Sequence, residues 1–251
     1  MLLTQERMPI ALGVLGGMGC LASAEFTRTV YELNVCEREQ DSPAVILLSD
    51  PSFPDRTQTF NDGDIPALVS MLGRRLAQLY ALGAGRVVLG CVTLHYALPL
   101  LPPELRGGVL SLVDVALTHA AESGRRQLLL CSSGARAARV FEGHEKWPRV
   151  AARVVLPDEE DQRFVHSMLY RYKVEVGEQP LLPYLEGLLE KYEADSFIAG
   201  CSELHMLTKY LRGRPTGYRF IDPLLLIAQN LGAYLGAGAA PKVGQAEACS
   251  V

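Results

Sequence analysis

Short apolar runs alternate with longer amphipathic segments along most of the chain. The runs predict buried strands over residues 10–15, 44–49, 87–89, 109–112, 127–131, 154–157 and 197–199. The longer segments predict helices over 21–34, 65–82, 113–122, 159–174, 181–192 and 222–235, with another from residue 135 onward. In 65–82, Leu68, Leu72, Leu76 and Leu79 recur at helical spacing on one face. Strands alternating with helices predict an α/β fold whose parallel sheets are flanked by helices.

One six-residue pattern, Gly-Cys-x-x-Leu-His, occurs twice in the chain. It covers residues 90–95 and 200–205, and each copy follows an apolar run and precedes a possible helix start. Cys91 and Cys201 therefore fall at the carboxyl ends of buried strands, where open α/β sheets place their ligand sites. The strand, small-residue turn and helix that open the chain are echoed after residue 127. We infer an internal duplication into two similar lobes, with the active cleft between them.

Composition narrows the range of partners and compartments. The net charge of −4, the pI near 5.8 and the lack of basic runs give no basis for a nucleic-acid partner. No apolar stretch reaches about 18 residues, so no membrane span is expected. Residues 1–9 show no signal-peptide pattern, which predicts a cytoplasmic protein. The six cysteines form no CxxC pair, so we expect neither a metal site nor a disulfide framework.

Two loops carry candidate binding groups. The Gly-Gly-Met-Gly turn at 16–19 joins a predicted strand to a helix, and such turns let backbone N–H groups, here those of Gly17 and Met18, approach an anion. The alternative is a tight turn that holds no ligand. Arg56, in the loop that follows the second strand, presents a planar fork that matches a carboxylate. The alternative there is a surface arginine paired with a neighbouring aspartate.

The repeated cysteines suggest proton transfer at carbon. A thiol at a helix N-terminus lies among unpaired N–H groups, which predicts a lowered pKa. If Cys91 and Cys201 flank one carbon, one thiolate can take its proton while the opposite thiol donates another, which inverts the stereocentre. Arg56 and backbone N–H groups are candidates to stabilise the charge that develops. His95 and His205 each follow a cysteine by four residues and are possible modulators, the alternative being capping or core histidines.

Four segments taken together are similar to a known family. They are 13–19, the Pro-Asp-Arg-Thr loop at 54–57, Cys91-x-Thr93-x-His95-Tyr96, and Gly-Cys-Ser-Glu-Leu at 200–204. In this order, and from about residue 11 to 223, the chain resembles the aspartate racemase branch of the aspartate/glutamate racemase superfamily. The resemblance implies two lobes related by a pseudo-twofold axis. Residues 1–113 with 222–251 then form the first lobe, and residues 114–221 form the second.

The resemblance also implies an activity. It is that of an isomerase, a racemase or epimerase of an acidic amino acid or a related substrate, which uses neither pyridoxal phosphate nor another cofactor nor a metal. The expected partners are a small amino acid or dicarboxylate and a second copy of the chain in a homodimer. Cys91 and Cys201 match the catalytic pair and Arg56 matches the substrate-binding arginine. The further candidate substrate-binding residues are Gly17, Met18, Thr93, Ser132, Ser202, Glu203 and Lys173.

Some positions depart from the family pattern. Val92 stands where an asparagine that helps to hold the substrate is usual, and His205 replaces a usual proline. Counting back from Gly177 places Glu175 near the usual site of a carboxylate-binding lysine and leaves Lys173 offset. This register favours a less acidic or modified amino acid as substrate. Two alternatives stay open: an isomerase or decarboxylase of a small diacid with one nucleophilic cysteine, and a non-catalytic ligand-binding relative.

Overall fold

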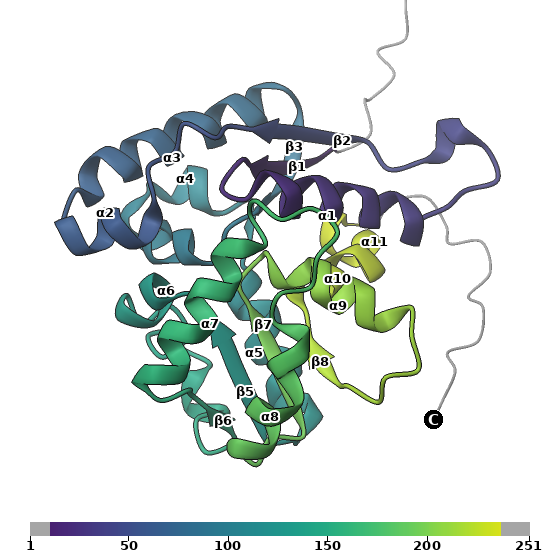
Figure 1. Cartoon of the computed structure of the whole chain (residues 1–251). Coiled ribbons are helices and arrows are strands. Elements are labelled where there is room, and N and C mark those ends of the chain that lie inside the picture. Colours follow the sequence, from purple (N-terminus) through teal and green to yellow (C-terminus); the bar gives the residue numbers. More distant parts are fainter. Residues whose placement is uncertain (1–10, 237–251) are drawn as a thin grey trace, which may run out of the picture.

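The chain forms two parallel sheets of four strands each, as the computed structural model of residues 11–236 shows (Figure 1). The first sheet has the order β2-β1-β3-β4 and contains β1 (Ala11–Gly16), β2 (Val45–Ser49), β3 (Ala84–Leu89) and β4 (Val109–Leu110). The second has the order β6-β5-β7-β8 and contains β5 (Gln127–Cys131), β6 (Val154–Val155), β7 (Ser196–Gly200) and β8 (Phe220–Ile221). In each sheet the second strand is outermost and the first lies beside the third. The predicted α/β fold with two similar lobes is therefore confirmed.

Helices cover both sheets, and several begin at a capping side chain. The α-helices are α1 (Cys20–Leu33), α2 (Arg56–Asp62), α3 (Ile65–Ala81), α4 (Pro103–Arg106), α5 (Leu112–Ser123), α6 (Ser133–Ala137), α7 (Glu159–Arg171), α8 (Leu182–Lys191), α9 (Leu204–Arg212), α10 (Pro223–Gln229) and α11 (Leu231–Leu235). Short 3₁₀ helices occur at η1 (Glu39–Asp41), η2 (Thr93–Leu100) and η3 (Trp147–Arg149). Side-chain oxygens accept N–H bonds at the starts of α2, α5, α6, α7 and α10, from Asp55, Ser111, Ser132, Asp158 and Asp222.

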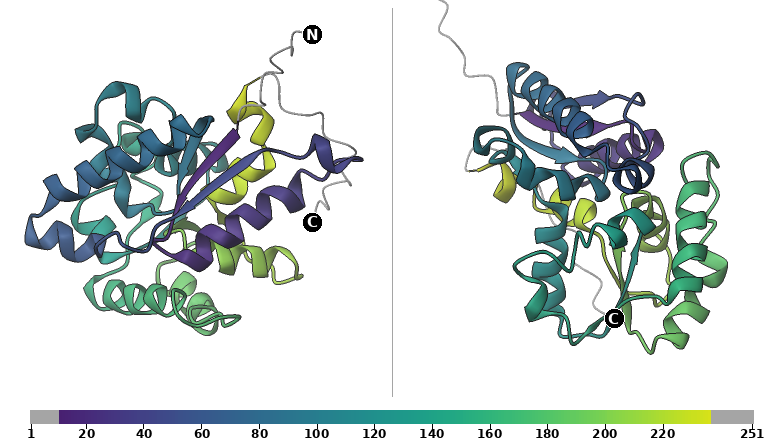
Figure 2. Two further views of the ribbon diagram at one scale, coloured as in Figure 1. Left: turned by 90° about the horizontal axis from the view of Figure 1, so that it is seen from above. Right: turned by 90° about the vertical axis from the view of Figure 1, so that its left-hand side faces the viewer.

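The two lobes share part of their core. One cluster of buried side chains contains Leu12 and Phe26 from the first lobe, Leu129 and Ile198 from the second, and Ile227 of α10. The C-terminal helices return to pack beside α1, while the two sheets lie one above the other in the side view (Figures 1 and 2). The division into residues 1–113 with 222–251 and residues 114–221 stays a prediction.

Several predicted elements differ from the observed ones. The loop at 50–57 leads directly into α2, because Asp55 accepts bonds from the N–H groups of Thr57 and Gln58 and starts a helix. The helix predicted over 222–235 is broken at Asn230, and β8 was not predicted. Residues 1–10, which include the start of the first predicted strand, and residues 237–251 lie outside the described residues. None of the described helices is long and apolar enough to span a membrane.

Candidate active site

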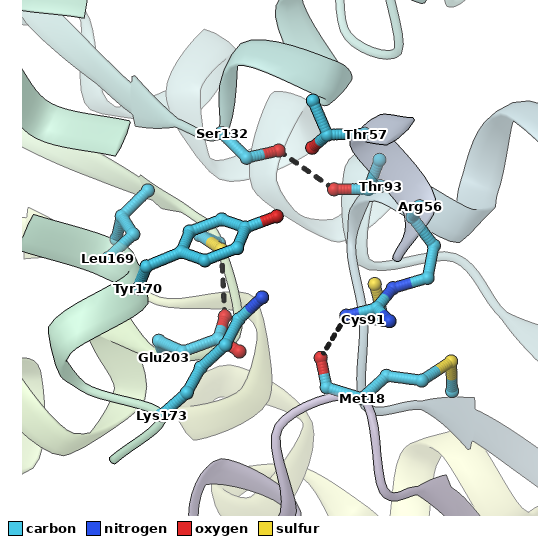
Figure 3. Close-up of a pocket in the computed structure, with 11 residues that line it drawn as sticks. Met18, Arg56, Thr57, Cys91, Thr93, Ser132, Leu169, Tyr170, Lys173 and Glu203 are labelled. Atoms are coloured by element: carbon cyan, nitrogen blue, oxygen red, sulfur yellow. Dashed lines mark hydrogen bonds between the residues drawn. The ribbon is translucent and has the colours of Figure 1, made fainter. Parts of the chain in front are cut away.

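A small cavity lies where the carboxyl ends of β3 and β7 approach each other (Figure 3). It has about 280 Å³ of space free of atoms, part of it open to solvent. Both lobes supply its walls, and in Figure 3 Tyr170, Lys173 and Glu203 lie across from Arg56, Cys91 and Met18. The lining residues are Met18, Arg56, Thr57, Cys91, Thr93, Ser132, Leu169, Tyr170, Lys173, Cys201 and Glu203.

The two repeated cysteines both line this cavity. Cys91 follows β3 after one residue and is 5% exposed, whereas Cys201 follows β7 directly and is 8% exposed. Each strand is almost fully buried at this end, so the sheets hold both thiols in place. Two thiols from two sheets therefore border one space, which is the arrangement needed to reach a single carbon from two sides.

The Cys201 thiol is paired with a carboxylate. Its Sγ donates a hydrogen bond to Oε2 of Glu203, 2.8 Å away, and Glu203 is only 2% exposed. Burial raises the pKa of the Cys201 thiol, and the negative charge of Glu203 and the hydrogen bond to it raise the pKa further. The predicted lowering by a helix N-terminus is thus wrong for Cys201, because desolvation and a neighbouring anion outweigh the helix N–H groups.

Arg56 lies at the start of α2 and is directed inward, with 8% of its surface exposed. Its guanidinium donates to the carbonyl oxygens of Met18 at 2.7 Å and Pro54 at 3.0 Å, and its Nε has no hydrogen-bond partner. Burial alone would lower the pKa of Arg56, but charge interaction and hydrogen bonding with Cys91 outweigh it and raise the pKa. The surface-arginine alternative is therefore wrong, since this cation faces the cavity and Cys91.

A second cation, Lys173, lines the cavity from the other lobe. Its Nζ lies 3.6 Å from the centre of the Tyr170 ring, and it forms no ion pair within the described residues. The Tyr170 hydroxyl donates to Oδ2 of Asp55 at 2.5 Å, which fixes the ring across the lobe boundary. Glu175 instead pairs with Arg171 at 2.7 Å and does not line the cavity.

The placement of Glu175 near the substrate was therefore wrong. Helix α7 ends at Arg171, and in the turn that follows the Glu175 N–H donates a hydrogen bond to the Arg171 carbonyl oxygen. Counting from Gly177 assumed a continuous helix, which this turn interrupts. Lys173 consequently occupies the cavity, and the inferred preference for a less acidic substrate loses its basis.

Two hydroxyl groups meet across the lobe boundary on another wall of the cavity. Thr93 Oγ1 and Ser132 Oγ lie 2.9 Å apart, and Ser132 also accepts the N–H of Ala135 as the cap of α6. Thr93 does not cap η2, which begins without a side-chain cap, because the Thr93 hydroxyl is directed to Ser132. These hydroxyls are placed to contact a polar ligand.

Gly17 and Ser202 belong to the frame of the site and do not line the cavity. Gly17 has a φ of 92°, and a Cβ there would lie 2.3 Å from the Asp50 carbonyl carbon, so only glycine fits this turn. The turn directs the next residue, Met18, into the cavity. The Ser202 hydroxyl donates to the Gly90 carbonyl at 2.9 Å and ties the two cysteine loops together.

The two histidines lie behind the cavity. His95 donates from Nδ1 to the Val92 carbonyl at 3.0 Å and accepts the Leu112 N–H at Nε2, also at 3.0 Å, so the ring is neutral. Burial lowers the pKa of His95 to about 4. His205 is fully buried, with Asp222 Oδ2 2.6 Å from Nδ1 and Thr29 Oγ1 2.8 Å from Nε2. Neither ring reaches the cavity, which favours the core-histidine alternative for both.

Residues 15–231 match the family model described as Asp/Glu/Hydantoin racemase. The chain belongs to the Asp/Glu/Hydantoin racemase family. The matched range includes the second sheet, all of the first sheet except residues 11–14, and every residue that lines the cavity. The predicted resemblance is thereby confirmed at the level of the family, and membership supports amino-acid racemase chemistry.

Solved structures of the racemase family share this fold. An aspartate racemase from Picrophilus torridus has a TM-score of 0.73 at 21% identity, over 87% of this chain and 91% of that one. An aspartate racemase homologue from Pyrococcus horikoshii OT3 has a TM-score of 0.60 at 16% identity, over 88% and 96%. A glutamate racemase from Francisella tularensis, in complex with D-glutamate, has a TM-score of 0.59 at 14% identity, over 88% and 79%. At these identities the likeness shows the fold alone.

The sequence reasoning missed three residues of the cavity, Thr57, Leu169 and Tyr170. Tyr170 lies in the last turn of α7, and its spacing from Lys173 gives no signal because Lys173 lies beyond the end of that helix. Thr57 follows Arg56 directly in the Pro-Asp-Arg-Thr loop at 54–57, where only Arg56 had been taken as a candidate. Leu169 carries no chemical signal and reads as an ordinary core position. Within the described residues, no group of three or more His, Cys, Asp or Glu side chains is arranged to hold a metal ion.

Proposed function

We propose that this protein is a cofactor-independent racemase of an acidic amino acid and that Cys91 and Cys201 are its paired acid and base. The observation that carries the proposal is that thiols from two different sheets line one cavity together with two cations. A single base would return a proton to the face it came from, whereas opposed groups allow inversion.

The reaction balances without any further reactant. One cysteine thiolate takes the Cα proton and becomes a thiol, and the electron pair of the broken C–H bond is delocalised onto the substrate carboxylate. Arg56, a buried cation with a free Nε, is placed to stabilise that charge. The opposite thiol then donates its proton to the other face of Cα and becomes a thiolate. The product is the other enantiomer, and the reverse reaction uses the same groups.

The charges of the cavity support a dicarboxylic amino acid as substrate. Arg56 and Lys173 are cations contributed by different lobes, so each can hold one carboxylate of the same molecule. The Glu203 carboxylate and the hydroxyls of Thr93 and Ser132 are placed for the amino group and other polar contacts. We propose aspartate or glutamate as the substrate class, with Met18 forming the wall beside Arg56.

The test is incorporation of solvent deuterium at Cα, combined with chiral analysis, across a panel of acidic, amide and neutral amino acids. We expect racemisation of an acidic amino acid and its loss in Cys91→Ala and in Cys201→Ala. If both variants retain wild-type exchange, the assignment fails. A stable adduct on one cysteine with a small diacid would instead indicate an isomerase or decarboxylase. The proposed homodimer is tested separately by sedimentation equilibrium.

A further inference from the structure

The two cysteines have almost the same burial but opposite electrostatic partners. Cys201 donates its S–H to the buried carboxylate of Glu203, whereas Cys91 interacts with the guanidinium of Arg56. We propose that Glu203 is a positioning residue that keeps the proton on Cys201, so that the resting site has Cys91 as its base and Cys201 as its acid. The role of Glu203 in catalysis rests on the proposed function, whereas the protonation of Cys201 can be measured whether or not the protein is a racemase.

The surroundings of Glu203 hold its carboxylate against Cys201. Glu203 lies in the short connection between β7 and α9, and its Oε2 is 2.8 Å from Cys201 Sγ. Its other oxygen, Oε1, is buried without a hydrogen-bond partner. A Cβ on Gly19 would lie 2.5 Å from Oε1, so the glycine turn of the first lobe packs directly against this carboxylate. Oε2 also accepts the Ser202 hydroxyl at 3.3 Å, so the Cys201 thiol at 2.8 Å is the closest donor to this buried anion. A buried anion with one unsatisfied oxygen therefore depends strongly on the thiol proton that it accepts.

The charges around the pair favour this distribution of protons. If Cys201 lost its proton, two anions would lie in contact in a desolvated site, and water would not screen them. Cys91 adds a further negative charge when it is a thiolate, while Lys173 is the cation that opposes these effects at Cys201. Burial, Glu203 and Cys91 outweigh Lys173 and raise the pKa of Cys201. Arg56 lies on the Cys91 side of the cavity and also interacts electrostatically with Glu203.

The consequence for catalysis is an asymmetric resting enzyme. The enantiomer whose Cα–H faces Cys91 binds to an enzyme in which Cys91 is already a thiolate base, and Cys201 supplies the proton on the opposite face. After turnover Cys91 is a thiol, and Cys201 is a thiolate beside Glu203, which is the less stable distribution. Because the two enantiomers have equal free energies, kcat/KM is equal in the two directions for every variant. The asymmetry is therefore measured on the free enzyme.

The experiment is alkylation of the full-length protein with iodoacetamide, in which a thiolate displaces iodide, followed by peptide mass spectrometry of each cysteine across pH. Fitting the midpoint of each pH profile separates proton affinity from access, which differs little between thiols that are 5% and 8% exposed. Exposed Cys20 serves as the control that the reagent is active at each pH. Buried Cys131, whose pKa is raised to about 12 by burial, serves as an unreactive control.

In the wild type we expect the Cys201 midpoint to lie well above the ordinary value of a cysteine thiol, because its proton is donated to the buried Glu203 carboxylate. In Glu203→Gln the Cys201 midpoint falls by about one unit or more, which gives about tenfold faster labelling below the midpoint. Glu203→Asp, which keeps the charge, restores most of the difference. Glu160→Gln, an exposed acid in the first turn of α7, changes neither profile.

Two results overturn the proposal. One is a wild-type Cys201 midpoint at or below the ordinary value of a cysteine thiol, which decides the matter even if Glu203→Gln does not fold. The other is a folded Glu203→Gln protein, verified by circular dichroism, whose Cys201 midpoint is unchanged. Failure of the racemase proposal has a different signature, namely the expected labelling profiles without any Cα exchange.

Discussion

Removal of the Asp222 carboxylate tests the link that joins the C-terminal helices to both lobes. Asp222 is 2% exposed and accepts hydrogen bonds from the N–H groups of Leu224 and Leu225, as the cap of α10. Its Oδ2 also lies 2.6 Å from His205 Nδ1 and 2.5 Å from Thr208 Oγ1, both on α9. His205 in turn reaches α1 of the first lobe, so Asp222→Ala breaks a connected buried network.

The expected loss can be worked out from this arrangement. Loss of a helix cap costs about 1 kcal/mol, and each polar group left buried without its partner, here on His205 and Thr208, costs about 1–3 kcal/mol, which gives a total of about 3–5 kcal/mol. For a chain of this length, 1 kcal/mol shifts Tm by about 2–4 °C. Asp222→Ala should therefore lower Tm by roughly 6–20 °C near neutral pH.

The effect of this substitution should depend on pH. Burial alone would raise the pKa of Asp222, but its interaction with His205 and the hydrogen bonds from His205 and Thr208 outweigh burial and lower the pKa below the ordinary value of an aspartate. A carboxylate with a depressed folded-state pKa stabilises the fold above its unfolded pKa, and this stability is lost as pH falls through the folded pKa. The Tm difference between wild type and Asp222→Ala should therefore shrink below about pH 4.

Differential scanning calorimetry from acidic to neutral pH measures both effects. The matched control is Asp158→Ala, because Asp158 caps α7 in the same way but is exposed to solvent. We expect a clearly smaller Tm loss for Asp158→Ala. Equal losses in the two variants, or a loss for Asp222→Ala that is the same at every pH, would refute the reasoning.

Three further predictions concern the cavity and its frame. Lys173→Met should lower kcat/KM for a dicarboxylic substrate by about 10- to 100-fold, mostly through KM, because a charged hydrogen bond contributes about 1.5–3 kcal/mol. The control variant Glu175→Gln should leave steady-state kinetics unchanged, and equal effects of the two substitutions would contradict the assignment of Lys173. Arg56→Lys should lower kcat by about a hundredfold, since an ammonium cannot reproduce the buried fork; a kcat within a few-fold of wild type would show that Arg56 does not stabilise the developing charge. Gly17→Ala should destabilise the protein by at least about 1–3 kcal/mol in thermal unfolding, because a Cβ would collide with the Asp50 backbone at a positive φ; an unchanged Tm would exclude that strain.

The sequence predicted the features that depend on periodicity and repetition. The repeated Gly-Cys-x-x-Leu-His pattern located both thiols, because the same strand-to-loop transition occurs once in each lobe and brings Cys91 and Cys201 to equivalent strand ends. Strand and helix periods were sufficient for the two parallel sheets, since buried strands and amphipathic helices have distinct spacings.

Features that depend on local hydrogen bonding or on contacts between lobes were harder to predict. Lys173 lies beyond the end of α7, so its direction depends on a turn that residue counting cannot reveal. The pKa of Cys201 is raised by burial and by its contact with Glu203, whereas a position near a helix N-terminus had predicted a lowered pKa. The partner of His205 is Asp222, 17 residues away in sequence, and only the packed structure brings the two together.

The most direct test of the central claim is Cα exchange by single-cysteine variants in deuterium oxide, with each enantiomer of the substrate supplied separately. If Cys91 and Cys201 approach one carbon from opposite sides, Cys201→Ala and Cys91→Ala should exchange opposite enantiomers, and neither should racemise. We expect the slower exchange in Cys91→Ala, where Glu203 holds the remaining thiol protonated. Exchange of the same enantiomer by both variants, or racemisation that survives the loss of either thiol, would contradict the account.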